Sequence, residues 1–249
     1  MIFCLLAACG CRICDRVIIA LVNSKGGVGK STIAGNLVAW LHLHGHKVIL
    51  VDCDTQKSSS EWIAEAFPEI RIVRLETAED VLDELPQLQS DADYIVCDGP
   101  GSQTETSRSL LMWADLAIVP CKAGMFEARA LDKNTRFIRQ AQLIRKGPPE
   151  AVAVLSMVGK GYRLTQDMRD AAKALQLTLA KSTVTLRQAY ADAPGQSTVV
   201  WKMGTKEQDA AAEIDTLFRE LIPEACTERP SKVTSMRQGR AKIAANQKK

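Results

Sequence analysis

A glycine-rich stretch constrains the fold of this chain more than any other feature. Residues 17–22 are apolar and predict a buried strand, and a helical pattern begins at Lys30. Between them lies the sequence SKGGVGKST, residues 24–32. Its ending, Gly29-Lys30-Ser31, fits the phosphate-binding motif G-x-x-x-x-G-K-[ST], in which backbone N–H groups and a helix N-terminus hold phosphates. A strand, this loop and a helix in succession predict a nucleotide-binding α/β domain.

The loop departs from the ordinary motif at its beginning. Ser24 stands where the motif has glycine, and Lys25 adds a second cation. Residues 25–31 resemble the deviant Walker A motif of the ParA/MinD family, which also includes nitrogenase iron proteins, arsenite-pump ATPases and some amidoligases. The resemblance implies two catalytic lysines: Lys25 reaches the partner's phosphates in an ATP-sandwiched homodimer, and Lys30 serves its own subunit. The residues expected to bind the nucleotide are Gly26, Gly27, Val28, Gly29, Lys30, Ser31 and Thr32.

Carboxylates follow two further apolar runs. Residues 47–51 lead into Asp52 and Asp54, and residues 94–97 lead into Asp98. In open α/β sheets ligands bind at the carboxyl ends of the strands, so we expect these side chains to face the phosphate loop.

These two segments resemble the switch sequences D-x-D-P-Q and D-x-P of the same family, with Thr55 in place of the first proline. The resemblance implies that Asp54 orients or activates the attacking water. It also implies a Mg²⁺ site formed or supported by Ser31, Asp52 and Asp98. Gly99 and Gly101, in the loop after Asp98, are expected to let the backbone respond to the γ-phosphate.

The rest of the chain alternates apolar runs with helical patterns, which predicts a doubly wound, mostly parallel sheet with helices on both faces. A chain of 249 residues with 46% apolar residues can form one sizeable core, and it contains no run of 18 apolar residues. We expect a P-loop ATPase domain over residues 16–223. The other strands are expected at 70–75, 115–120 and 151–157, and the helices at 30–44, 58–67, 78–88, 126–145, 163–175 and 207–221.

The two ends of the chain differ from the domain between them. Residues 1–15 contain four cysteines and are expected to be a poorly ordered extension, although a lipoprotein-like cleavage site before Cys9 and a metal site remain alternatives. Residues 224–249 are expected to be a disordered basic tail, because Arg229 to Lys249 holds seven basic residues and no acidic one. The tail makes a poor amphipathic membrane helix, so no membrane is expected as a partner.

Two residue types could suggest metal or redox chemistry. Cys53, Cys97, Cys121 and Cys226 are scattered along the chain and are expected to be thiols of a reducing compartment. The chain's three histidines alternate between positions 42 and 46, where we expect a surface helix end rather than a metal site.

The resemblance covers residues 17–222 and is nearest to the small ParA type, which lacks a helix-turn-helix module. It implies a cytoplasmic, nucleoid-associated, Mg²⁺-dependent ATPase with weak basal activity, used in plasmid or chromosome partition. Such a protein dimerises on ATP, binds DNA nonspecifically and is stimulated by a ParB-like centromere-binding protein. A MinD-like membrane-surface ATPase and an enzyme or electron donor of the same fold are alternatives.

Residues 185–193 resemble a late ParA segment in which an arginine contacts DNA, so Arg187 is the first DNA-binding candidate. Contacts of this kind would bind phosphate without reading bases. Adenine recognition is less defined, because Ser156 stands where the family commonly has asparagine. The further DNA-binding candidates are Lys202, Lys206 and Arg219.

Overall fold

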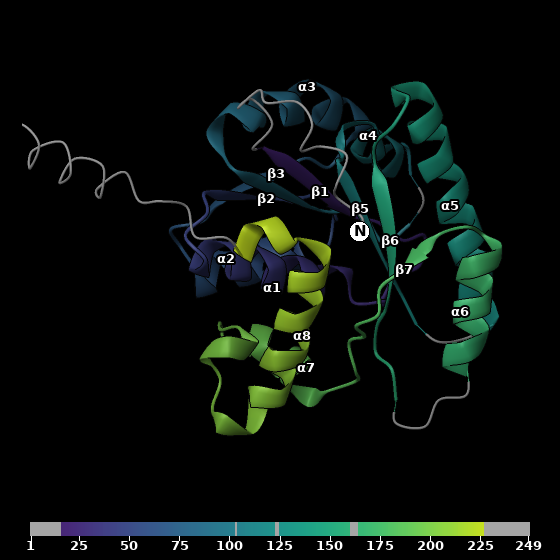
Figure 1. Ribbon diagram of the computed structural model, residues 1–249. Helices are drawn as coiled ribbons and strands as arrows, with labels where there is room; N and C mark the ends of the chain where they lie inside the picture. Colours follow the sequence, from purple (N-terminus) through teal and green to yellow (C-terminus); the bar gives the residue numbers. More distant parts are fainter. Residues whose placement is uncertain (1–15, 103, 123–124, 160–163, 227–249) are drawn as a thin grey trace, which may run out of the picture.

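A parallel β-sheet forms the centre of the molecule (Figure 1). The computed structural model describes residues 16–102, 104–122, 125–159 and 164–226. Its seven strands lie in the order β3-β2-β4-β1-β5-β6-β7, and every neighbouring pair is parallel. The strands are β1 (Val17–Leu21), β2 (Val48–Asp52), β3 (Arg71–Arg74), β4 (Tyr94–Asp98), β5 (Leu116–Cys121), β6 (Glu150–Leu155) and β7 (Thr178–Leu179).

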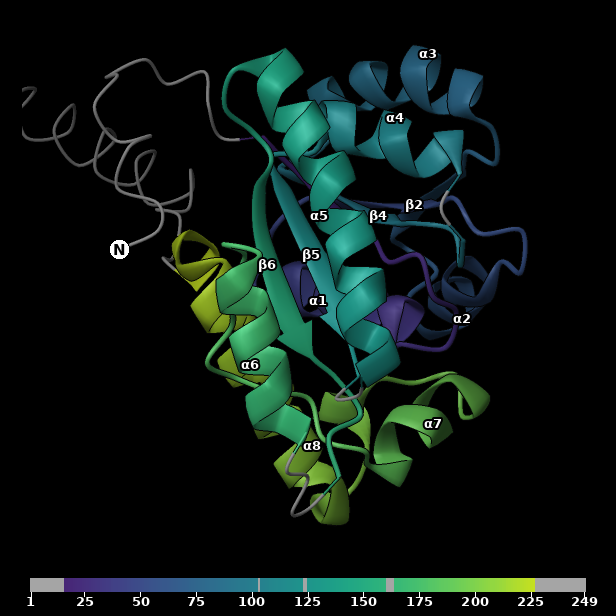
Figure 2. The same cartoon turned by 90° about the vertical axis from the view of Figure 1, so that its right-hand side faces the viewer.

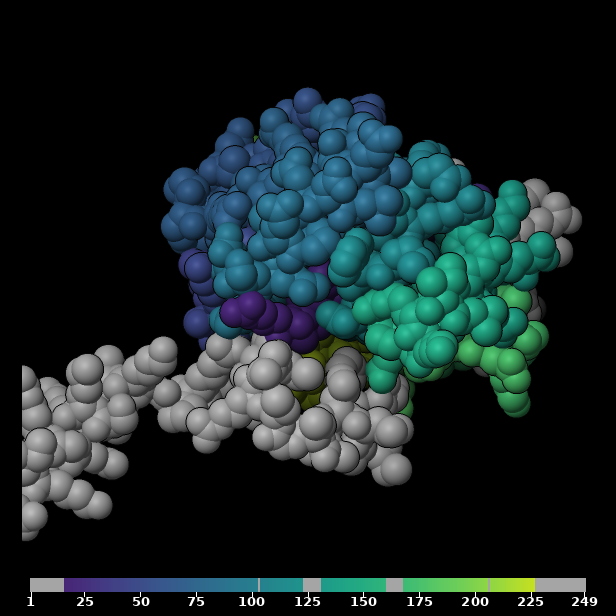
Figure 3. Space-filling model, turned by 90° about the horizontal axis from the view of Figure 1, so that it is seen from above, coloured from purple at the N-terminus to yellow at the C-terminus, as the bar shows by residue number. Residues whose placement is uncertain are grey.

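Helices cover both faces of this sheet, as Figures 1 and 2 show from two sides. One face packs against α1 (Lys30–Leu43), α2 (Ser58–Ala66), α7 (Gln188–Gly195) and α8 (Gln208–Leu221). The other face packs against α3 (Ala78–Leu88), α4 (Glu105–Trp113), α5 (Met125–Arg145) and α6 (Leu164–Ala174). In Figure 3 the blue and teal atoms of α3 to α5 form the outer surface on this second face. The predicted doubly wound α/β fold is thereby confirmed.

The interior strands are mostly apolar because both faces of the sheet are covered, whereas the edge strand β3 begins and ends with an exposed arginine. Within β1, Ile19 and Leu21 pack toward α1, whereas Ile18 and Ala20 pack toward the opposite helices. Alternating residues of a strand point to opposite faces, so each strand contributes to two separate cores.

Helix α7 was not predicted from the sequence, and neither were two further elements, α4 and β7. Helix α4 buries Thr106, Ser107 and Ser109, so small polar residues stand at buried positions where a helix usually has apolar residues. Thr104 begins this helix by accepting a hydrogen bond from the Ser107 backbone N–H at 3.4 Å. Strand β7 has only two residues, too few for any pattern. Neither α4 nor β7 carries the local signal on which the other predictions rested.

The structure corrects the interpretation of one histidine and extends the fold at its end. His46 is buried, not part of a surface helix end: its Nε2 lies 2.9 Å from the Ala225 carbonyl oxygen, and its ring meets Tyr94 edge-on. Ala225 belongs to a short 3₁₀ helix, Pro223–Cys226, which packs against the core beyond residue 223. The predictions for residues 1–15, and for the tail from residue 227 onward, lie outside the described residues.

Candidate nucleotide site

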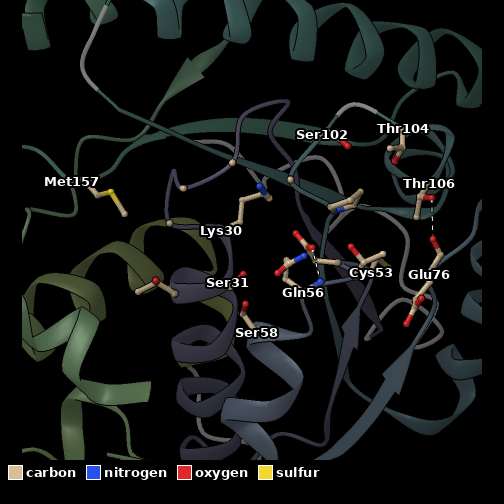
Figure 4. Close-up of a pocket in the computed structure, with 18 residues that line it drawn as sticks. Lys30, Ser31, Cys53, Gln56, Ser58, Glu76, Ser102, Thr104, Thr106 and Met157 are labelled. Carbon is tan, nitrogen blue, oxygen red and sulfur yellow. Dashed lines mark hydrogen bonds between the residues drawn. The ribbon is translucent and has the colours of Figure 1, made fainter. Parts of the chain in front are cut away.

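The carboxyl ends of three adjacent strands bring the predicted site together. Leu21 of β1 and Asp52 of β2 both pair in register with Asp98 of β4, so the segments after these strands lie side by side. They border a cavity of about 600 Å³ (Figure 4). Its lining includes Gly26, Gly27, Gly29, Lys30, Ser31 and Thr32 from the phosphate loop, Cys53 to Gln56 after β2, and Pro100 to Ser102 after β4.

Two glycines of the loop adopt a backbone conformation that other residues rarely tolerate. Gly27 has φ +66° and Gly29 has φ +90°, both in the left-handed region. Gly29 directly precedes α1, whose N-terminus has no capping side chain and borders the cavity at Lys30 and Ser31. The positive end of the helix dipole therefore faces the space in which phosphates would bind.

Lys30 is held in place by the backbone of its own loop. Only 5% of the residue is exposed, and its Nζ donates a hydrogen bond to the Lys25 carbonyl oxygen at 3.2 Å. Burial lowers the pKa of Lys30, while the nearby charges of Asp98 and Asp54 act in the opposite direction. The structure thus places Lys30 and Asp54 at one cavity, with the buried Asp98 close enough for its charge to act on Lys30.

Asp98 is fully buried, and neither of its carboxylate oxygens has a hydrogen bond of normal geometry within the described residues. Burial raises the pKa of Asp98 to about 7, although the hydroxyls of Ser31 and Ser59 and the charge of Lys30 favour the ionised form. Buried polar atoms without partners are rare and often mark the site of an ion. A divalent cation next to Asp98 and Ser31 would satisfy both oxygens, so these residues fit Mg²⁺.

The two aspartates after β2 differ in their surroundings. Asp52 is buried, and its carboxylate accepts the backbone N–H groups of Asp54 at 3.0 Å and Ser60 at 2.9 Å. It therefore shapes the loop and orders the first turn of α2. Asp54 is partly exposed and lines the cavity, with its Oδ1 accepting the Gln56 backbone N–H at 3.0 Å. Of the two, Asp54 has the better access to a water in the cavity, whereas a role of Asp52 at the metal remains a prediction.

Two buried asparagines that the sequence analysis missed fix the beginning of the phosphate loop. The Oδ1 of Asn23 accepts the Lys25 backbone N–H at 2.9 Å and the Nδ2 of Asn134 at 3.1 Å. Asn134 lies on α5, 111 residues away from Asn23, and accepts the Ser24 backbone N–H at 3.1 Å. Asparagine inside a long helix gives no sequence signal for such a contact. In the described structure the cavity lining includes Lys30 but not Lys25.

A smaller apolar cavity of about 130 Å³ continues from the large one at Gly29, Thr32 and Met157. The hydroxyl of Ser156 donates a hydrogen bond to the Val28 carbonyl oxygen at 2.6 Å. Ser156 therefore supports the phosphate loop from β6. The rest of the lining is formed by Ile33, Val184, Thr185, Leu186, Arg187, Tyr190 and Ala191.

The DNA-binding candidates with described side chains have intramolecular partners. Arg187 forms ion pairs with Glu213 at 3.3 Å and Asp209 at 3.6 Å. The Nζ of Lys202 lies 3.8 Å from the centre of the Phe67 ring. Arg219 pairs with Asp215 at 2.6 Å. The side chain of Lys206 lies outside the described part, and DNA contact at all four residues remains a prediction.

The described cysteines are free thiols: three are buried, and Cys226 is half-buried. Burial raises the pKa values of the Cys53 and Cys97 thiols. Cys53 also lines the large cavity, a position not anticipated from the sequence. Among the described residues, no group of three or more His, Cys, Asp or Glu side chains could hold a metal ion, and no described helix is long and apolar enough to cross a bilayer.

Comparison with known proteins places these features in a family. Residues 19–200 match the CobQ/CobB/MinD/ParA nucleotide-binding domain. The chain is 27% identical over 212 residues to the maintenance of carboxysome distribution protein A of Halothiobacillus neapolitanus, covering 82% of this chain and 96% of that protein. It is also 28% identical over 148 residues to a ParA protein of Rhizobium radiobacter, covering 59% and 67% of the two chains.

Solved structures share the fold. An ATP complex of a McdA variant from Cyanothece superposes with a TM-score of 0.69 at 14% identity, covering 83% of this chain and 96% of that one. The Mg-ADP complex of MinD from Pyrococcus horikoshii gives a TM-score of 0.68 at 18% identity, covering 86% and 99%. Nucleotides bound to these relatives support the predicted cofactors, ATP and Mg²⁺.

Proposed function

Because the chain belongs to the CobQ/CobB/MinD/ParA family of nucleotide-binding domains, we propose that it is an ATPase that binds ATP with Mg²⁺ in the large cavity. One observation carries this proposal. The buried Lys30 of the phosphate loop lines the cavity, and nearby Asp98, at the end of β4, has two carboxylate oxygens with no hydrogen-bond partner among the described residues. The first fits the charge of a triphosphate and the second fits the metal that accompanies it.

Each group has a task that follows from its position. Backbone N–H groups of the loop and the first turn of α1 bind the phosphates, and Lys30 neutralises charge on them as it develops. Ser31 and Asp98 hold Mg²⁺, which supplies positive charge to the phosphate oxygens when bound. Asp54 orients a water toward the γ-phosphate, because it lines the cavity and is partly exposed. The small apolar cavity takes the base.

Lys25 has its task in a homodimer. Its backbone N–H is fixed by Asn23, yet the residue does not line the described cavity of its own chain. This arrangement fits a lysine that serves the phosphates of a second subunit.

Lys25→Ala is therefore expected to weaken ATP-dependent dimerisation at least tenfold while the monomer still binds ATP, because a charge-assisted contact across the interface is lost. The measurement is sedimentation velocity with ATP and with ADP, together with nucleotide titration of the monomer. Lys173→Ala removes an exposed lysine of α6 and serves as the control. Equal dimerisation of the Lys25→Ala and wild-type proteins would contradict the sandwich arrangement.

The proposed cellular role is partition or positioning of a DNA or protein cargo. The names of two relatives support this role: one concerns carboxysome distribution, and that of a Thermus thermophilus protein, 55% identical over 42 residues, concerns chromosome partitioning. The ATP dimer binds DNA nonspecifically and releases it after hydrolysis that a ParB-like or analogous partner stimulates. The protein is then nucleoid-associated in the cytoplasm.

DNA binding is expected only in the ATP-bound state and is expected to weaken as salt is raised, because phosphate contacts release counterions. The test measures binding to a random-sequence duplex without nucleotide, with ADP, with ATP and with a slowly hydrolysed ATP analogue, each at two salt concentrations. Equal binding in all states would show that charge alone attracts DNA. No binding in any state would favour the membrane-surface or enzyme alternatives.

A further inference from the structure

A single carboxylate on α8 organises one wall of the small cavity. Glu213 accepts hydrogen bonds from the Thr185 backbone N–H at 2.8 Å and from the Thr185 hydroxyl at 2.7 Å. The Tyr190 hydroxyl lies 3.0 Å from its Oε1, and the Arg187 Nε lies 3.3 Å from its Oε2. Only 14% of this side chain is exposed. Both carboxylate oxygens of Glu213 are thus engaged by the segment that follows β7.

These three partners, Thr185, Arg187 and Tyr190, all line the small cavity. The segment that contains them is also tied to the end of β6, because Val158 donates its backbone N–H to the Val184 carbonyl and accepts the Leu186 N–H, both at 3.1 Å. Glu213 therefore supports a segment that lines the small cavity next to the phosphate loop, and it does so from the side of α8.

We propose that Glu213 is a positioning residue for the nucleoside part of the nucleotide. This inference rests on the proposed function, in which the base occupies the small cavity. A carboxylate can accept hydrogen bonds from Thr185 and Arg187 together and from the Tyr190 hydroxyl, whose one proton it shares with the Ala210 carbonyl oxygen at 2.9 Å. An amide in its place offers one acceptor oxygen and turns an N–H toward these donors. Without the carboxylate, the cavity lining formed by Thr185, Arg187 and Tyr190 loses its fixed shape. Arg187, which pairs with Glu213 and Asp209, also loses the nearer of these two partners.

The structure supplies a matched control on the same helix. Glu220 of α8 accepts the backbone N–H groups of Lys181 at 2.7 Å and Ser182 at 2.9 Å, and neither of these residues lines the small cavity. Glu220→Gln thus disturbs the same kind of contact between α8 and a loop, away from the proposed base site.

The test compares Glu213→Gln, Glu220→Gln and wild-type protein by titration with Mg-ATP and with Mg-tripolyphosphate, which has the phosphates but no nucleoside. Glu213→Gln is expected to bind ATP about tenfold more weakly and tripolyphosphate within about twofold of wild type. Glu220→Gln is expected to match wild type with both ligands. Thermal unfolding without ligand measures the general destabilisation of each variant.

The outcomes separate this inference from the proposed function. Equal loss of affinity for both ligands in Glu213→Gln, or unchanged ATP affinity, would overturn the role of Glu213 while leaving the ATPase intact. Equal loss of ATP affinity in Glu213→Gln and Glu220→Gln would also overturn it. A wild-type protein that binds no ATP would overturn the proposed function itself.

Discussion

Replacing Lys30 with alanine is expected to lower the rate of ATP hydrolysis by about 10²–10³-fold, the range found when one preorganised group that stabilises developing charge is removed. Lys30 is buried, and its Nζ is hydrogen bonded to the backbone of its own loop, so the fold fixes the position of the cation. A buried charge in a fixed position needs little reorganisation during the reaction. The measurement is phosphate release at saturating Mg-ATP, with enough protein to populate the dimer.

Two comparisons make this prediction specific. Lys30→Arg is expected to restore little activity, because the larger planar guanidinium does not fit the enclosed position of an ammonium. Lys25→Ala should retain nucleotide binding by the monomer, which separates the two lysines of the loop. Hydrolysis by Lys30→Ala within about threefold of wild type, at equal protein stability, would remove Lys30 from the mechanism.

Gly99→Ala is expected to lower the free energy of unfolding by about 3 kcal/mol or more, at the upper end of the cost of overpacking a core. A Cβ at this position would lie 2.6 Å from the Leu21 carbonyl oxygen. That oxygen accepts the Gly99 N–H at 3.0 Å, next to the Leu21–Asp98 register pair of β1 and β4. Neither strand can move aside alone, because both lie in the interior of the sheet with parallel neighbours on each side.

Denaturant unfolding of the free protein measures this effect. Gly147→Ala is the control, since a Cβ there would meet no atom within 4 Å and the residue does not require a left-handed backbone. Gly147→Ala should therefore unfold at nearly the wild-type denaturant concentration. A Gly99→Ala protein as stable as Gly147→Ala would show that β1 and β4 can separate without cost.

Gly99 also shows how a sequence interpretation can be incomplete. Its place after the aspartate of a switch sequence led to the prediction that it lets the backbone respond to the γ-phosphate, and that response is still untested. What the structure adds is a packing requirement, because the backbones of β1 and β4 approach too closely for any side chain. No local pattern could reveal that approach, since the two segments lie far apart in the chain.

Ser156 and Arg187 illustrate the same limit. Ser156, standing where the family commonly has asparagine, left adenine recognition undefined, and the position of Arg187 suggested DNA binding. In the fold, Ser156 donates to the Val28 carbonyl 128 residues away, and Arg187 pairs with carboxylates of α8. Glu213, which pairs with Arg187, and Asn134, which holds the beginning of the phosphate loop, have no motif around them.

The sequence by itself determined the phosphate loop, the order of most strands and helices, and the aspartates at the strand ends. These features depend on contiguous residues: the glycines that permit the turns, the lysine and hydroxyl that follow, and the apolar runs of a sheet covered on both faces. Parallel pairing then required Asp52 and Asp98 to meet at one edge of the sheet.

Only the tertiary structure decided which polar groups have partners. Asp52 is satisfied by backbone N–H groups, whereas Asp98, its register neighbour, has two buried oxygens without hydrogen bonds in the described structure. Burial and hydrogen bonding depend on side chains brought together from α1, α2, α5 and α8, which are separated by tens to more than a hundred residues. The charge state and the ligand preference of this site therefore follow from packing, because the cost of burying a charge depends on every group that surrounds it.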